Sequence, residues 1–116
     1  MAQHFSRVDL VGNLTATPTY IQAGEKKVAI AEGGIAVERP SKNGSSAGVD
    51  FVDFVAFDAL ADVVRELPKG TAVKIEGILR QDRWTNDQGQ KRSRLKVVAK
   101  RVYVLQELAA ERQGEA

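Results

Sequence analysis

The chain has 116 residues, enough for one domain with a hydrophobic core and too few for two. It contains no cysteine and a single histidine, His4, which excludes disulfides, thiolate metal sites and a histidine cluster. No apolar run approaches the ~20 residues of a membrane span and the N-terminus lacks an apolar secretion core, so we expect a cytoplasmic protein. The formal net charge is only +2, but the charge is unevenly distributed.

Strand patterns dominate the first half of the chain. Residues 8–14 alternate between apolar and other side chains, which predicts a strand with one buried face. A turn at 23–26 precedes a β-rich stretch over 28–37, where Gly33 and Gly34 suggest a bulge or a sharp bend. Residues 40–48 have the composition of a mobile loop, and residues 50–57 form a third strand.

The apolar period changes after residue 57. Leu60, Val63, Val64 and Leu67 share one helical face, which predicts a helix over 58–67. We expect Asp58 to cap this helix at its N-terminus, and the sequence Pro-Lys-Gly at 68–70 to end it.

A long hairpin completes the domain. Residues 71–84 alternate as a strand with Val73, Ile75, Gly77 and Leu79 on one face, residues 86–90 form a turn, and residues 92–105 return. The order of elements predicts an all-β fold, a five-stranded OB-fold barrel with one helix between strands 3 and 4. This domain covers residues 1–106 and is followed by a short C-terminal tail at 107–116.

The last hairpin carries most of the positive charge. Residues 80–101 contain eight lysines and arginines against two acids, while the other residues are net negative. The only tryptophan, Trp84, lies in this stretch, where cations can neutralise a nucleic-acid backbone and a ring can stack on bases. Alternation places Arg80 and Asp82 on the face of Trp84. If Leu95, Val97 and Ala99 point inward on the returning strand, Arg94 and Lys96 share that outer face. The alternative is a Trp84 that packs on the barrel rim under arginine stems.

The third strand can be interpreted in two ways. Phe51, Asp53, Val55 and Phe57 form one face, and Val52, Phe54 and Ala56 form the other. Composition alone slightly favours burying the set that contains Phe51 and Phe57.

Six segments together resemble the bacterial single-stranded DNA-binding protein family over residues 5–105. They are RVDLVGNL at 7–14 followed by Pro18, DFVDFVAF at 50–57, LADV at 60–63, LPKG at 67–70, VKIEGILR at 73–80 and RWTNDQGQ at 83–90. Their order and spacing make the resemblance specific. It implies sequence-tolerant binding of single-stranded DNA in replication, recombination or repair by a nucleoid-associated homotetramer built from dimers.

The resemblance also implies roles for particular residues. Trp84 and Phe57 match DNA-stacking aromatics, and Phe51 occupies the position of a further stacking tryptophan. Phe51 and Phe57 then face the ligand, and Val52, Phe54 and Ala56 become the inward set. Together with the basic stretch, the expected DNA-binding residues are Arg7, Phe51, Phe57, Lys74, Arg80, Arg83, Trp84, Arg92, Arg94 and Lys96.

Three departures from the family pattern bear on affinity and partners. Residues 38–42 lack a further tryptophan, Phe51 replaces one, and Asp53 stands where a basic residue is common. The segment 111–116 lacks the acidic tip through which such proteins recruit others, so we expect no recruitment by that route. An alternative function is a replication-restart accessory OB module that acts mainly through protein contacts. We expect no enzyme activity, cofactor or metal site, because Asp50, Asp53 and Asp58 read as a strand edge and a helix cap.

Overall fold

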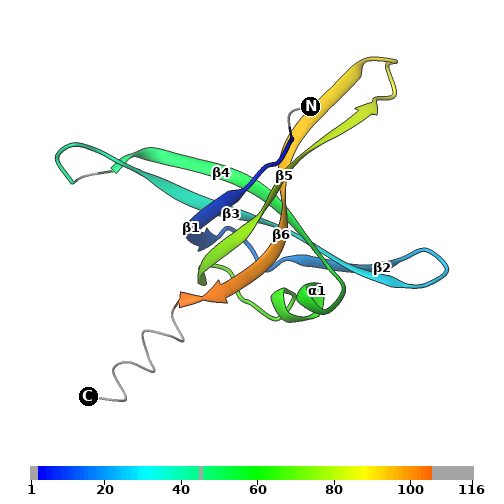
Figure 1. Cartoon of the computed structure of the whole chain (residues 1–116), viewed down its shortest axis with the longest axis horizontal. Coiled ribbons are helices and arrows are strands. Elements are labelled where there is room, and N and C mark those ends of the chain that lie inside the picture. Colours follow the sequence, from blue (N-terminus) through cyan, green and yellow to red (C-terminus); the bar gives the residue numbers. More distant parts are fainter. Residues whose placement is uncertain (1–2, 45, 106–116) are drawn as a thin grey trace.

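The computed structural model describes residues 3–44 and 46–105. These residues form six strands and one helix, namely β1 (Val8–Leu14), β2 (Thr19–Ala23), β3 (Val28–Pro40), β4 (Ser46–Phe57), α1 (Asp58–Val64), β5 (Ala72–Thr85) and β6 (Lys91–Val104). The strands follow the order β1-β5-β6-β4-β3-β2, and an additional pairing of β1 with β3 closes the sheet. The result is a closed five-stranded OB-fold barrel, as predicted, with α1 between its third and fourth strands (Figure 1).

The core fills the barrel and is closed at one end by α1, which contributes Ala61 and Val64. Strand alternation supplies the rest: Val73 and Ile75 of β5 are fully buried, as the pattern predicted. On β4, Phe54, Val55 and Ala56 are buried. Phe54 and Ala56 belong to the barrel core and Val52 packs against it, which confirms the inward set implied by the family resemblance. Composition alone had favoured the opposite face.

Gly33 and Gly34 do not form the bulge that the sequence suggested. Strand β3 pairs with β4 in continuous register through both glycines, and the register shift falls between Glu38 and Pro40. Close packing explains the glycines: a Cβ on Gly33 would lie 2.9 Å from Cζ of Phe54, and one on Gly34 would lie 2.7 Å from Oγ1 of Thr15.

Several element boundaries also differ from the sequence predictions. Strand β2 was not predicted, because its five residues lie between a break and a turn. The loop assigned to 40–48 is shorter, since β4 already begins at Ser46. Asp58 lies inside α1 with a φ of 57°, and the N-cap position belongs to Phe57, which makes no side-chain capping bond. Val63 is exposed, and Ala61 lies on the buried face with Val64.

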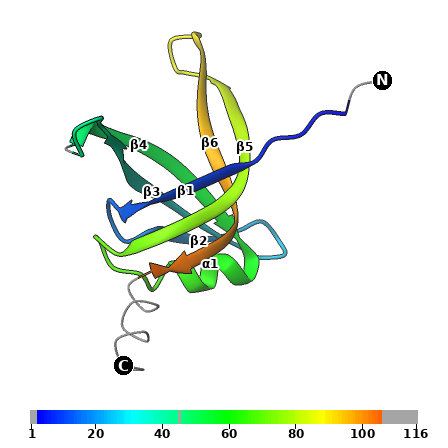
Figure 2. The same cartoon turned by 60° about the vertical axis from the view of Figure 1, so that its left-hand side comes forward.

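Two long hairpins extend beyond the barrel and diverge from each other (Figure 1). We call the outer parts of β3 and β4 the β3–β4 arm, and the outer parts of β5 and β6 the β5–β6 arm. The parallel pairing of β4 with β6 is limited to Phe54 with Val97 and Val55 with Val98, so the strands separate beyond these residues. Figure 2 shows the two arms rising from the same side of the barrel with an open angle between them.

Candidate nucleic-acid interface

The β5–β6 arm presents the tryptophan and the basic residues on one face. Trp84 pairs across the strands with Arg92, Asp82 pairs with Arg94, and Arg80 pairs with Lys96. Residues that pair directly across an antiparallel ladder project to the same side, so all six side chains share a surface. The Trp84 side chain is 47% exposed. The arrangement agrees with the face expected from the sequence and does not bury the ring.

Acidic residues neutralise part of this basic face. Nζ of Lys96 lies 2.7 Å from Oδ2 of Asp82, and Nη1 of Arg94 lies 3.6 Å from Oδ2 of Asp53. Arg92 donates a hydrogen bond of 3.3 Å to Oε1 of Gln90 instead. Within residues 3–44 and 46–105, neither Arg80 nor Arg92 forms an ion pair. No acidic side chain there neutralises these two guanidinium groups, so both can pair with an anionic ligand.

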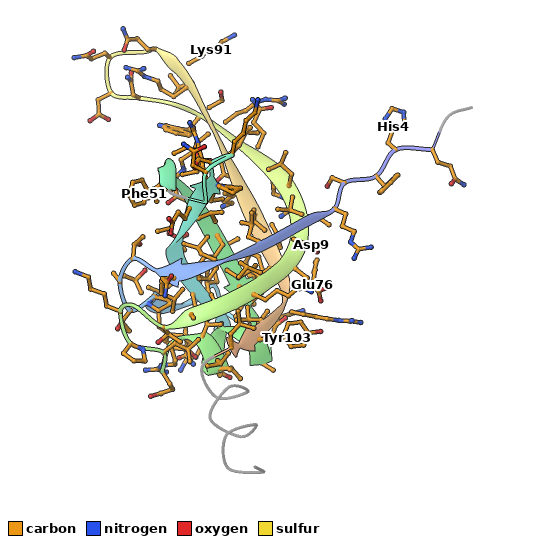
Figure 3. All side chains as sticks on the ribbon, turned by 90° about the vertical axis from the view of Figure 1, so that its left-hand side faces the viewer. His4, Asp9, Phe51, Glu76, Lys91 and Tyr103 are labelled. Carbon is orange, nitrogen blue, oxygen red and sulfur yellow. The ribbon has the colours of Figure 1, made fainter. Side chains whose placement is uncertain are left out.

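Phe51 and Phe57 of β4 lie on the strand face opposite that of the core residue Phe54. Phe51 is 75% exposed on the β3–β4 arm, whereas Phe57 is half-buried at the base of the strand, where it pairs with Ile30. Figure 3 shows Phe51 on the side of the molecule away from Asp9 and Glu76. Phe51 and Trp84 therefore belong to different arms, and a ligand that contacts both must cross the opening between the arms.

Three basic residues of the expected set are also separated from the Trp84 face. Arg7 precedes β1 and forms an ion pair of 3.2 Å with Asp9. Lys74 lies ten residues before Trp84 on β5, roughly 30 Å along the strand, and is 3.7 Å from a carboxylate oxygen of Glu76. Arg83 alternates to the opposite face of the arm, where it donates a hydrogen bond of 2.7 Å to Gln81.

The expectation that Leu95 points inward was wrong. Leu95 is 59% exposed, while Val97 and Ala99 of the same strand are buried as expected. Leu95 does alternate to the same face as Val97 and Ala99. At Leu95, however, the β5–β6 arm already extends beyond the barrel, so this face of the arm is not covered by the core. Leu79 of the paired strand is 45% exposed for the same reason.

The sequence did not indicate a depression at the root of the arms, which we call the root depression. Its volume is about 240 Å³, and it is lined by Thr19, Glu32, Gly33, Asp53, Phe54, Val55, Arg94 and Lys96. Glu32 was missed because only the pairing of β3 with β2 and β4 brings it beside Asp53 and the cations of β6. No local motif at Glu32 could have revealed that neighbourhood.

Side-chain hydrogen bonds stabilise both arms. Oδ1 of Asn86 accepts hydrogen bonds from the backbone nitrogens of Gln88 and Gln90, which fixes the predicted turn of the β5–β6 arm. On the other arm, Nε and Nη2 of Arg39 donate hydrogen bonds of 2.6–3.0 Å to the Asp50 carboxylate. These bonds hold the pKa of Asp50 below its usual value.

An OB-fold barrel with an exposed tryptophan on a basic hairpin belongs to the class of oligonucleotide-binding OB domains. The sequence profile described as "Single-strand binding protein family" matches residues 5–105. The chain is 35% identical over 116 residues to a Single-stranded DNA-binding protein of Wolinella succinogenes, with 95% of this chain and 70% of that protein covered. A protein of the same name from Thermotoga maritima is 34% identical over 117 residues, covering 96% of this chain and 81% of the relative.

The chain belongs to the single-strand binding protein family. The helix in the described part of the chain is too short to cross a membrane. The 107–116 tail, including the segment expected to lack an acidic tip, lies outside the described residues.

Proposed function

We propose that this protein binds single-stranded DNA with little dependence on sequence and protects it during replication, recombination or repair. The observation that carries the proposal is the pairing of the exposed Trp84 with Arg92 on an arm that also presents Arg80. Membership of a family whose relatives are named Single-stranded DNA-binding protein supports the same ligand.

In the proposed mechanism, cations hold the DNA backbone while aromatic rings stack on its bases. Arg80 and Arg92 supply charge that no acid neutralises within the described residues, and phosphate contacts by such groups release counterions. Trp84 and Phe51 offer flat, exposed rings on the two arms. Because every base has a π-face, stacking tolerates any sequence. Phe57 is half-buried, so its contribution is limited to one edge or face of the ring.

A titration with fluorescently labelled oligonucleotides tests the proposal. We expect a single strand to bind far more tightly than its duplex, because stacking requires unpaired bases. Affinity should fall steeply as salt increases from 50 to 200 mM, in proportion to the phosphates neutralised. Equal binding to single and double strands, or binding that ignores salt, would refute this function.

We also propose that the protein is a homotetramer built from dimers. Residues 8–13 of β1 pair with β5 on one side, and only Asn13 and Leu14 pair with β3 on the other. Among the described residues, this leaves most of one β1 edge without a strand partner. An unpaired strand edge is a ready template for a second copy. Light scattering coupled to size-exclusion chromatography should give four times the chain mass of 12.6 kDa.

A replication-restart accessory module remains the second candidate. The feature that favours it is Asp53, whose carboxylate pairs with Arg94 and reduces the charge available to DNA. Such a module would retain a protein partner at high salt and show no affinity for single strands. For the DNA-binding proposal we expect the reverse, with no enzymatic turnover of the bound strand.

A further inference from the structure

The root depression differs from the rest of the proposed interface in its charge. Two carboxylates, Glu32 of β3 and Asp53 of β4, line it together with Arg94 and Lys96 of β6. Its charges therefore balance, whereas a site for phosphate requires an excess of cations. Its volume of about 240 Å³ leaves room for a single flat ring.

The carboxylates in the root depression are available to a ligand. The distance from Asp53 to Arg94 is 3.6 Å, longer than the ~2.7–3.2 Å of an N–H···O hydrogen bond. Both side chains are about half exposed, at 54% and 53%, and exposed ion pairs contribute little to stability. Oγ1 of Thr19 donates to the backbone oxygen of Glu32, but across residues 3–44 and 46–105 neither the Glu32 nor the Asp53 carboxylate accepts a hydrogen bond.

We propose that the root depression binds one base of the strand and prefers cytosine to uracil or thymine. An ionised carboxylate only accepts hydrogen bonds, and arginine and lysine only donate them. Cytosine carries an amino group on one side of its ring and a carbonyl oxygen on the other. Its amino group can therefore donate to Asp53 or Glu32 while its carbonyl accepts from Arg94. The amino group of cytosine has two N–H donors, one for each carboxylate, whereas uracil and thymine have a single N3–H donor between two carbonyl oxygens, so they satisfy at most one carboxylate and bring a carbonyl toward the other.

This inference rests on the proposed single-strand binding and adds a modest preference to it. Exposed aromatics on the two arms still stack on any base, so the preference concerns only the base seated at the root. Oligo-deoxycytidine and oligo-deoxyuridine of equal length are the matched probes, because their bases differ only in the hydrogen-bonding groups at position 4 and N3 and not by a methyl group. At pH 7.5 the full chain should bind oligo-deoxycytidine about tenfold more tightly.

Two variants assign the preference to the carboxylates. In Asp53→Ala and in Glu32→Ala the ratio of the two affinities should fall toward one. Asp53→Ala should also bind both strands more tightly than the natural chain does, because Arg94 loses its acidic partner. This gain distinguishes the result from a failure to fold. Glu25→Ala, which removes an exposed carboxylate from the turn between β2 and β3, should keep the natural ratio.

Equal affinity of the natural chain for the two strands would overturn the inference and leave the proposed function intact. A ratio that persists in both Asp53→Ala and Glu32→Ala would overturn it as well. Failure to bind either strand would instead refute single-strand binding itself.

Discussion

Trp84 on β5 lies directly across the ladder from Arg92 on β6, so the indole ring and the guanidinium project from the same face of the arm. The ring is 47% exposed and Arg92 has no acidic partner within the described residues. Stacking and phosphate neutralisation can therefore act on neighbouring parts of one nucleotide. Replacing one residue at a time can therefore separate the stacking contribution of Trp84 from the charge contribution of Arg92.

Replacing the tryptophan removes the stacking contribution. Trp84→Ala should weaken single-strand binding by about 1–3 kcal/mol, roughly 5- to 150-fold in Kd. Trp84→Phe should retain much of the affinity, since it keeps a π-face. Tyr103→Ala serves as the control, because Tyr103 pairs with Lys74 on the barrel, away from the arm. Anisotropy of a labelled oligonucleotide measures all three variants, and an unaffected Trp84→Ala would contradict the assignment.

Replacing the arginine removes a phosphate contact. Arg92→Gln should lower the slope of log K against log salt by about 0.7 for a single strand. Affinity should fall by a similar factor for strands of different sequence, because phosphate carries no sequence information. Arg101→Gln changes the charge of the same strand by the same amount on the barrel, opposite Glu76, and should leave the slope unchanged. Identical slopes for the two variants would argue against a phosphate contact at Arg92.

The close approach of β5 to β6 at Gly77 predicts a stability effect. A Cβ at this position would overlap the backbone carbonyl oxygen of Val98, which cannot move without shifting the sheet. Gly77→Ala should therefore lower the free energy of unfolding by about 3 kcal/mol. Gly24→Ala, where a Cβ meets no atom within 4 Å but φ is 76°, should cost only about 1 kcal/mol. Denaturant unfolding that ranks the two variants in the opposite order would exclude this explanation.

The Arg39–Asp50 ion pair predicts an acid-dependent contribution to stability. In the folded chain, hydrogen bonds from Arg39, opposed by desolvation and helped by its charge, hold the pKa of Asp50 below its ordinary value of 3.8. A carboxyl with a depressed folded pKa stabilises the protein above its unfolded pKa, and this contribution is lost as pH falls through the folded pKa. Asp50→Asn should thus reduce the melting temperature at pH 6 but not at pH 2. Asp87→Asn controls for the loss of one charge, and an Asp50→Asn difference that persists at pH 2 would rule out this origin.

The sequence predicted most of the barrel because burial follows local alternation. The period of two was enough to predict the face of β5 that carries Val73, Ile75 and Gly77. Asn86 and Gly89 indicated the turn that follows. Leu95 shows where this reasoning fails: its parity was correct, but whether an inner face meets a core depends on where the arm leaves the barrel. The prediction that Asp58 caps α1 was wrong for a related reason. Strand β4 runs directly into α1, which places Phe57 at the N-cap position.

The candidate site was predicted to the extent that it lies on one hairpin. Trp84, Arg92, Arg94 and Lys96 share a face because antiparallel pairing follows from a short turn. The same alternation places Arg83 on the other face of the arm. Arg83 was included among the expected DNA-binding residues because of its charge. Glu32 could not be found, since its position beside Asp53 results from pairings between β2, β3 and β4.

Titration of Trp84 fluorescence with an oligo-thymidine strand tests the central claim most directly, because the chain contains one tryptophan. Stacking of a base on the exposed ring should quench the emission in a saturable manner, and added salt should reverse the quenching. A matched duplex should leave the emission nearly unchanged. Emission that stays constant while a labelled strand is seen to bind would contradict the account, since DNA would then bind elsewhere on the molecule.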